Sequence, residues 1–186
     1  MNETVLLALG GNQSSEWGIA LETQQAAISR LCSDSIHTLK ASRFFSTPCF
    51  PAGAGPDFVN SALAVRTSLS PDELLLRLHE VEAEFGRKRI TRWGTRTLDI
   101  DLIAYGQQVL PDLAGYTAWR DLPLDQQMQH SPDQLILPHP RLQDRAFVLV
   151  PLLDVAPDWM HPTIGRTIAE MLENLPESDR NAVIPL

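Results

Sequence analysis

The alternating segment at 97–104 places the strongest constraint on the fold. Leucine or isoleucine occupies every second position from 98 to 102, and Asp99 and Asp101 stand between them. Residues two apart on a β-strand point to the same side of the sheet. We therefore predict a strand at 97–104 that has one apolar face in a core and both carboxylates side by side on the other.

Alternation and helical spacing predict the elements that precede this strand. They are a strand at 4–9, a helix that carries Trp17, Leu21, Ile28 and Leu31 and is capped by Ser14 or Ser15, strands at 36–45 and 57–67, and a helix that begins at Pro71. The order strand, helix, strand, strand, helix, strand is that of the ferredoxin-like folds. The predicted fold class is α/β (α+β), a βαββαβ core with helices packed on a central antiparallel sheet and further helices toward the C-terminus.

The helix that begins at Pro71 has the clearest local signals. Ser70 is a preferred capping residue, proline suits the first helical position, and Glu73 stands three residues after the cap. Gly86 can adopt the left-handed conformation that ends many helices. These residues predict both ends of the helix.

The length of 186 residues suits one domain, which we expect to span 1–186. The stretch 107–134 is polar, interrupted by prolines and weakly periodic, so it is predicted as a long surface excursion. Its centre, 112–131, is interpreted as an insertion. Further helices are expected within 146–156 and after Thr167.

Charge and composition exclude several classes of protein. A net charge of −8 disfavours broad electrostatic binding to nucleic acid or to an anionic membrane. The apolar stretch Val5–Leu9 is shorter than a secretory core, and the one at 146–153 is too short to span a bilayer. We therefore expect a cytoplasmic monomer whose partners are small molecules.

The acidic pair Asp99 and Asp101 is a candidate metal site. Two neighbouring carboxylates repel each other unless a cation or water lies between them, and Mg²⁺ takes one or two carboxylates while water and phosphate oxygens complete its shell. The alternative is an edge strand with a solvated acidic face. The preceding segment contains five cations in ten residues and no acid: Arg87, Lys88, Arg89, Arg92 and Arg96.

Such a basic run is often only a solvated surface, but beside paired carboxylates it favours a clamp for a triphosphate. Trp93 within it indicates either a loop that covers a ligand or simple packing. His139 lies between two prolines with Arg145 nearby, which fits a ligand contact or an exposed turn. Phe58 and Asn60 share one face of their strand, which suits a flat heterocycle, although Phe58 also fits a core.

Together these residues resemble the 6-hydroxymethyl-7,8-dihydropterin pyrophosphokinase family. The most specific matching block is 92–101, which contains the arginines, Trp93 and both aspartates. Supporting blocks stand at 8–12, 46–48, 56–60 and 137–141. A tyrosine is frequent in the family where Phe58 stands here, and the connection at 107–134 is longer than expected.

The resemblance implies that pyrophosphate passes from ATP to the hydroxymethyl oxygen of the pterin, as in folate biosynthesis. An RNA-binding module and a metal-dependent glycosyltransferase are the alternatives. The implied site has three groups of residues. Catalysis would use Arg87, Arg96, Asp99 and Asp101, with two Mg²⁺ ions on the aspartates; the nucleotide would contact Glu82, Arg89, Arg92, His139 and Arg145; and the pterin would contact Thr47, Pro48, Phe58, Asn60, Trp93 and Phe147.

Overall fold

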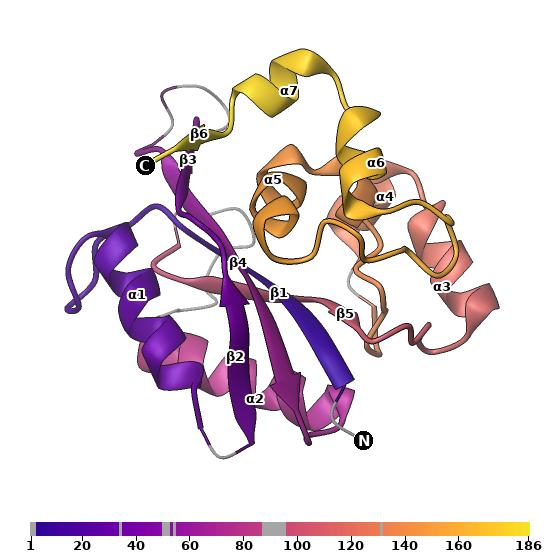
Figure 1. Ribbon diagram of the computed structural model, residues 1–186, viewed down its shortest axis with the longest axis horizontal. Coiled ribbons are helices and arrows are strands. Elements are labelled where there is room, and N and C mark those ends of the chain that lie inside the picture. Colours follow the sequence, from indigo (N-terminus) through magenta and orange to yellow (C-terminus); the bar gives the residue numbers. More distant parts are fainter. Residues whose placement is uncertain (1–2, 34, 50–52, 54, 87–95, 131) are drawn as a thin grey trace.

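The computed structural model describes residues 3–33, 35–49, 53, 55–86, 96–130 and 132–186. The N-terminal half forms most of a sheet and the helices on one side of it (Figure 1). Its elements are β1 (Glu3–Gly11), α1 (Ala20–Leu31), β2 (Ile36–Ala41), β3 (Phe45–Thr47), β4 (Phe58–Thr67), α2 (Pro71–Glu84) and β5 (Asp99–Tyr105).

The C-terminal half is mostly helical. It contains α3 (Leu113–Arg120), α4 (Leu124–Gln129), a 3₁₀ turn η1 (Leu142–Asp144), α5 (Ala146–Val155), α6 (Ile168–Glu173), α7 (Glu177–Asn181) and the short strand β6 (Ile184–Pro185). Among the described residues, no helix combines the length and apolar character that a membrane span requires.

The sheet is antiparallel, with the strand order β5-β1-β4-β3-β6 and with β2 also paired to β4. Its β5-β1-β4-β2 part, together with α1 and α2, is the ferredoxin-like arrangement, so the predicted fold class is confirmed. The strand expected at 36–45 is divided into β2 and β3. Ser42 lies at the division, where its backbone N–H donates to the Ala62 carbonyl at 2.9 Å and its Oγ accepts from the Ala62 N–H at 2.8 Å.

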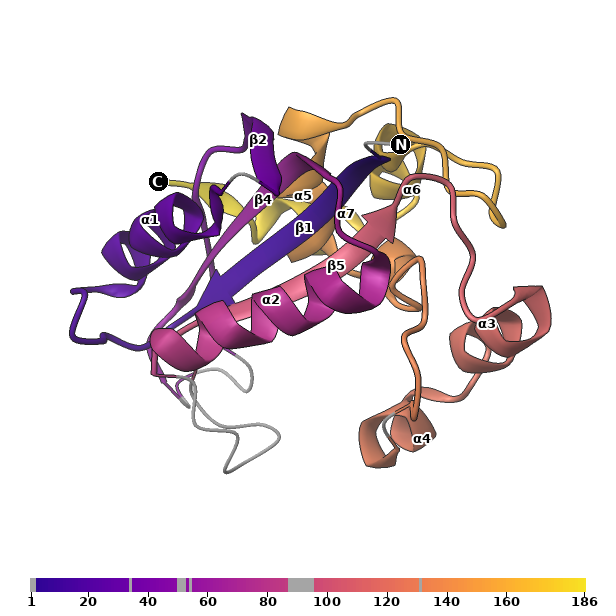
Figure 2. The same cartoon turned by 90° about the horizontal axis from the view of Figure 1, so that it is seen from below.

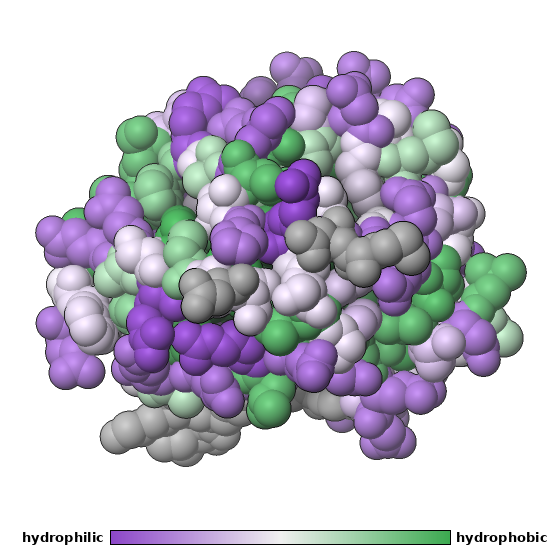
Figure 3. All heavy atoms as spheres, turned by 60° about the horizontal axis from the view of Figure 1, so that its bottom comes forward, coloured by the Kyte–Doolittle hydropathy of each residue, from purple (hydrophilic) through white to green (hydrophobic). Residues whose placement is uncertain are grey.

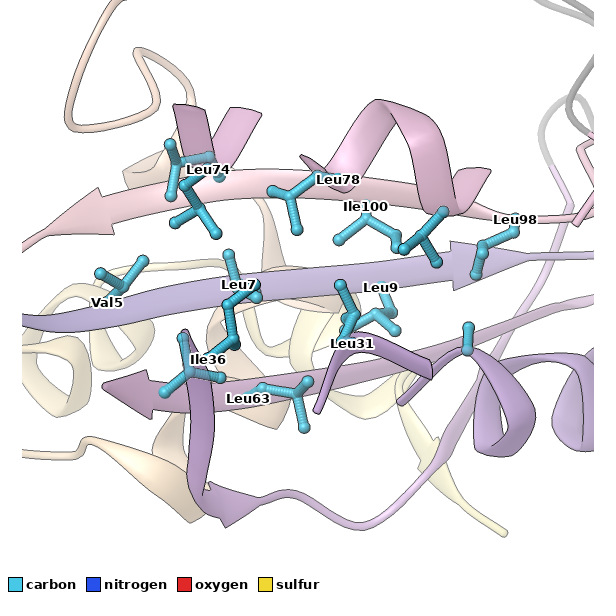
Figure 4. Close-up of a cluster of buried hydrophobic side chains, with 14 of the residues drawn as sticks. Val5, Leu7, Leu9, Leu31, Ile36, Leu63, Leu74, Leu78, Leu98 and Ile100 are labelled. Atoms are coloured by element: carbon cyan, nitrogen blue, oxygen red, sulfur yellow. The ribbon is translucent and has the colours of Figure 1, made fainter. Parts of the chain in front are cut away.

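Helices cover both faces of the sheet (Figure 2). On one face, alternate side chains of β1 pack with those of α1, α2 and the neighbouring strands, as the close-up in Figure 4 shows for Val5, Leu7 and Leu9. On the other face, Leu6 and Ala8 pack in a second cluster with residues of α5 and α6. Alternate side chains of β1 therefore contribute to two hydrophobic cores, one on each face of the sheet.

The predicted ends of α2 are correct. The Ser70 N–H donates to the Glu73 carboxylate at 2.8 Å, and Ser70 Oγ accepts from the Glu73 N–H at 3.4 Å. Gly86 follows the helix with a φ of 82°, in the left-handed region.

The predicted start of the first helix is wrong. Ser15 forms a tight turn with Gly18, whose φ of 111° interrupts helical geometry, and α1 begins only after Ile19. Trp17 therefore precedes the helix. The centre of its ring lies 5.0 Å from the ring centre of Phe85.

The excursion at 107–134 contains α3 and α4 and is not wholly a surface segment. Tyr116 of α3 is fully buried, and its hydroxyl lies 3.0 Å from Nε2 of the buried His161. Leu110 and Leu137 pair through two backbone hydrogen bonds, so the excursion leaves and rejoins the domain at one place.

Candidate active site

Strand register builds a row of three residues at one end of the sheet. Gly10 of β1 lies opposite Asn60 of β4 on one side and opposite Asp99 of β5 on the other. Directly opposed residues of an antiparallel pair point to the same face. A Cβ added to Gly10 would lie 3.4 Å from Asn60 Oδ1, so the absence of a side chain leaves the middle of this Asn60–Gly10–Asp99 row open.

The two carboxylates lie on the face predicted from the sequence. Leu98 and Ile100 are buried in the first core cluster, while Asp99 and Asp101 point to the face that carries Ala8. The side chain of Asp99 is only 17% exposed and bonds to the guanidinium of Arg96, whereas that of Asp101 is 38% exposed.

Arg145 completes the charged part of the site. It is the residue before α5, and its Nη1 lies 3.9 Å from Asp101 Oδ2. Burial lowers the pKa of its guanidinium, and the neighbouring Asp101 partly opposes this effect. A partly desolvated cation beside a carboxylate is well suited to receive an anionic ligand.

His139 is neutral at physiological pH. Desolvation, reinforced by the charges of Arg145 and Arg141, lowers its pKa to about 3. The Arg141 N–H donates to Nδ1 at 3.1 Å, which assigns the ring proton to Nε2. The backbone N–H of His139 donates to the Ile103 carbonyl at 2.8 Å and so holds this residue against β5.

The polar and aromatic residues expected to bind a heterocycle lie at the same end of the sheet. Asn60 is buried, and its Nδ2 donates to Thr47 Oγ1 at 2.9 Å. Phe58 is opposite Thr47 in the β3–β4 register. Phe147, in the first turn of α5, keeps 42% of its surface exposed, and the Arg145 guanidinium lies 5.7 Å from its ring centre.

Other expected site residues are placed differently or are not described. Pro48 is exposed directly after β3. Glu82 is 1% exposed, and its carboxylate accepts from the Ile100 N–H at 2.7 Å, which joins α2 to β5. Its assignment to the nucleotide stays a prediction. Arg87, Arg89, Arg92 and Trp93 lie outside the described residues.

The donor set of the site fits magnesium that is shared with a phosphate ligand. Within the described part of the chain, no group of three or more His, Cys, Asp or Glu side chains forms a protein-only metal site. Asp99 and Asp101 nevertheless supply the one or two carboxylates that Mg²⁺ uses when phosphate oxygens and water complete its shell.

Two features of the site were not predicted from the sequence. The strand predicted at 4–9 stops before Gly10, and the position of Gly10 in the row depends on strand register. Asn12, directly after β1, is buried and hydrogen-bonded to two separate segments. Both residues belong to the short Gly-Gly-Asn segment at 10–12. That segment alone does not show which distant residues Gly10 lies opposite or Asn12 contacts.

The ferredoxin-like sheet thus carries acids, cations, and polar and aromatic side chains at one end. The family model for 7,8-dihydro-6-hydroxymethylpterin-pyrophosphokinase (HPPK) matches residues 6–157. The chain belongs to this family. It is therefore an enzyme of folate biosynthesis that uses ATP as co-substrate and transfers pyrophosphate to a pterin alcohol, and neither alternative class is supported.

Curated relatives carry the name 2-amino-4-hydroxy-6-hydroxymethyldihydropteridine pyrophosphokinase. One from Synechocystis is 37% identical over 182 residues, which cover 97% of this chain and 79% of the relative. One from Pseudomonas aeruginosa is 37% identical over 183 residues, which cover 95% of this chain and 94% of the relative.

The fold is also similar to solved structures. The wild-type HPPK-DHPS of Plasmodium falciparum matches with a TM-score of 0.65 and 15% identity over 93% of this chain. This chain spans 41% of that longer protein. At this identity the likeness supports the fold alone.

Proposed function

We propose that pyrophosphoryl transfer takes place over the Asn60–Gly10–Asp99 row. The observation that carries this proposal is the register of β4, β1 and β5, because it puts an amide and a carboxylate on either side of a glycine. A pterin that contacts Asn60 would then have its hydroxymethyl group directed toward the phosphates near Asp99.

The pterin binds between Phe58 and Phe147, with its polar edge toward Asn60 and Thr47. Asn60 Nδ2 is already engaged by Thr47 Oγ1 at 2.9 Å, which fixes the amide so that Oδ1 can accept from a pterin N–H. Stacking on aromatic rings is favourable for flat heterocycles of this kind. Pro48 and Trp93 complete the pterin contacts in the proposal.

The triphosphate lies along Asp99 and Asp101. Asp99 and Asp101 would hold two Mg²⁺ ions, which would neutralise charge on the phosphates. The hydroxymethyl oxygen attacks the β-phosphorus, a new O–P bond forms, the bond between the α,β-bridging oxygen and the β-phosphorus breaks, and AMP leaves with that oxygen. The proton of the hydroxymethyl group passes to solvent or to a phosphate oxygen.

Basic and neutral donors of the chain assist this transfer. Arg96 is anchored by Asp99 and can approach the bridging region, and Arg145 lies beside Asp101. His139 offers Nε2–H as a neutral donor to a phosphate oxygen without adding charge. The remaining assigned residues take the roles that the family resemblance implies: Arg87 in charge stabilisation, and Glu82, Arg89 and Arg92 at the nucleotide.

We also propose that the chain is a cytoplasmic monomer with an insertion at 112–131. Support for the monomer comes from the surface: on the face in Figure 3, hydrophobic side chains are interspersed with hydrophilic ones. The paired residues Leu110 and Leu137 support the insertion, because they can close the chain without it.

The reaction can be tested directly with the purified chain, ATP, 6-hydroxymethyl-7,8-dihydropterin and Mg²⁺. We expect AMP to form in equal amount to pterin diphosphate, and only when the pterin and the metal are both present. Formation of ADP, or of AMP without pterin, would contradict the proposed transfer.

A further inference from the structure

Asn12 makes hydrogen bonds to two segments that are distant in the sequence. The residue is 4% exposed, Nδ2 donates to the Pro56 carbonyl at 3.1 Å, and Oδ1 accepts from the Arg96 N–H at 3.1 Å. The backbone N–H of Asn12 also donates to the Arg96 carbonyl at 2.9 Å. One partner is an acceptor and the other a donor, so the side chain needs both ends of an amide.

These two segments lead into the two halves of the site. Pro56 is two residues before Phe58, which begins β4 on the pterin side. Arg96 is three residues before Asp99 and bonds to its carboxylate on the phosphate side. Asn12 therefore links both halves of the site directly through hydrogen bonds.

Gly11 allows this link to be short. A Cβ at Gly11 would lie 2.5 Å from the backbone carbonyl oxygen of Thr97, so only glycine lets β1 approach the segment of Arg96 so closely. The end of β1 is consequently held against this segment by both backbone and side-chain contacts.

We propose that Asn12 is a positioning residue that fixes the separation between the bound pterin and the triphosphate. This inference rests on the proposed placement of both substrates over the Asn60–Gly10–Asp99 row. Transfer requires the attacking oxygen and the phosphorus to be aligned, and a displacement of about 1 Å can lower the rate about 100-fold. Asn12 touches neither substrate; it acts through Pro56 and Arg96.

Thr67 provides a matched control at the opposite end of the sheet. It is 1% exposed, its Oγ1 donates to the Ser35 carbonyl at 2.7 Å, and it accepts from the Leu69 N–H at 3.1 Å. Thr67 is opposite Glu3, whereas the site lies at the other end of β1. It therefore makes the same kind of double link without touching the site.

The experiment compares Asn12→Leu with Thr67→Val, which both remove a donor and an acceptor while nearly preserving volume. Melting temperature is measured first, so that turnover is compared well below both unfolding transitions. For Asn12→Leu we expect kcat to fall about 10- to 100-fold while each KM changes by less than about threefold. Thr67→Val should keep the parental kcat.

Amide hydrogen exchange supplies a readout that does not depend on activity. Asn12→Leu should raise exchange of the Arg96 N–H at least about tenfold, whereas Asn12→Asp, which keeps an acceptor oxygen, should retain its protection. A parental kcat in Asn12→Leu, or unchanged exchange at Arg96, would overturn the positioning role. Failure of the parent to form AMP would instead reject the proposed function, and the exchange data would still decide whether Asn12 holds the segment.

Discussion

At the scale of single residues, the sequence predicted which face of a strand a residue occupies wherever polar and buried apolar residues alternate. It did not predict contacts between residues that are far apart in the sequence. The faces of Asp99 and Asp101 follow from the apolar residues between them. The links of Asn12 do not, because its partners Pro56 and Arg96 are 44 and 84 residues away. Local periodicity contains no information about such contacts.

The acidic pair gives the first prediction. Replacing Asp99 or Asp101 with Asn should lower turnover about 100-fold or more, because an amide is a much weaker ligand for Mg²⁺ than a carboxylate. The parent should melt at a higher temperature with Mg²⁺ and an unreactive ATP analogue, since ligands stabilise the state that binds them. Both variants should lose most of that increase. Parental turnover with a full increase would identify the aspartate as an ordinary surface acid.

The proposed pterin slot gives the second prediction. Phe147→Ala should weaken pterin binding by roughly 1–3 kcal/mol, scaled from stacking of bases on aromatic side chains, and should leave ATP affinity nearly unchanged. Titration calorimetry with each ligand measures both effects. Leu153→Ala is a suitable control, because Leu153 is a similarly exposed residue in the same helix. Equal losses for pterin and ATP would indicate general damage to α5.

At the scale of elements, prediction succeeded where local chemistry decides the structure. Ser70 begins α2 and Gly86 ends it, and both act through neighbours that are close in the sequence. The start of α1 was missed because the turn between Ser15 and Gly18 competes with the helix. Burial of Tyr116 was missed because its partner, His161, belongs to a segment 45 residues later.

The contact between Tyr116 and His161 gives the third prediction, which concerns pH. Desolvation is the main cause that lowers the pKa of His161 to about 4, and Arg120 adds to it. Between about pH 6.5 and pH 4 the unfolded chain therefore binds a proton at this site that the folded chain does not. The free energy of unfolding should fall as pH decreases from 7 to 5, with His161 contributing on the order of 1–2 kcal/mol.

Urea unfolding at pH 7 and at pH 5 checks this expectation. His161→Gln should show a smaller decrease than the parent, because the variant lacks the group that gains a proton on unfolding. His139, whose pKa is also lowered, should account for part of the decrease that remains. An equal decrease in the parent and in His161→Gln would show that His161 is not responsible.

At the scale of the whole molecule, the candidate site and the excursion lie at opposite ends of β5. The strand begins at Asp99, within the candidate site, and ends at Tyr105, after which the chain enters the excursion. The Trp159 Nε1–H donates to the Gly106 carbonyl at 3.0 Å and ties that end to the C-terminal helices. The candidate site and the attachment of α3 are thus at opposite ends of one strand.

This separation gives the last prediction, in which residues 112–131 are replaced by a short Gly-Ser linker. The deletion removes Tyr116 and exposes His161, so it should lower stability by a few kcal/mol, about as much as losing a large buried aromatic side chain. The pairing of Leu110 with Leu137 should persist, and with it the approach of the chain to His139. Turnover measured well below the melting temperature should therefore stay within about threefold of the parent.

Leu113→Ser, which changes only an exposed side chain of α3, should alter neither stability nor turnover. A folded deletion variant whose pterin-dependent turnover falls about 100-fold would instead place the excursion in the active site, because a loss of that size requires disturbance of the reacting groups.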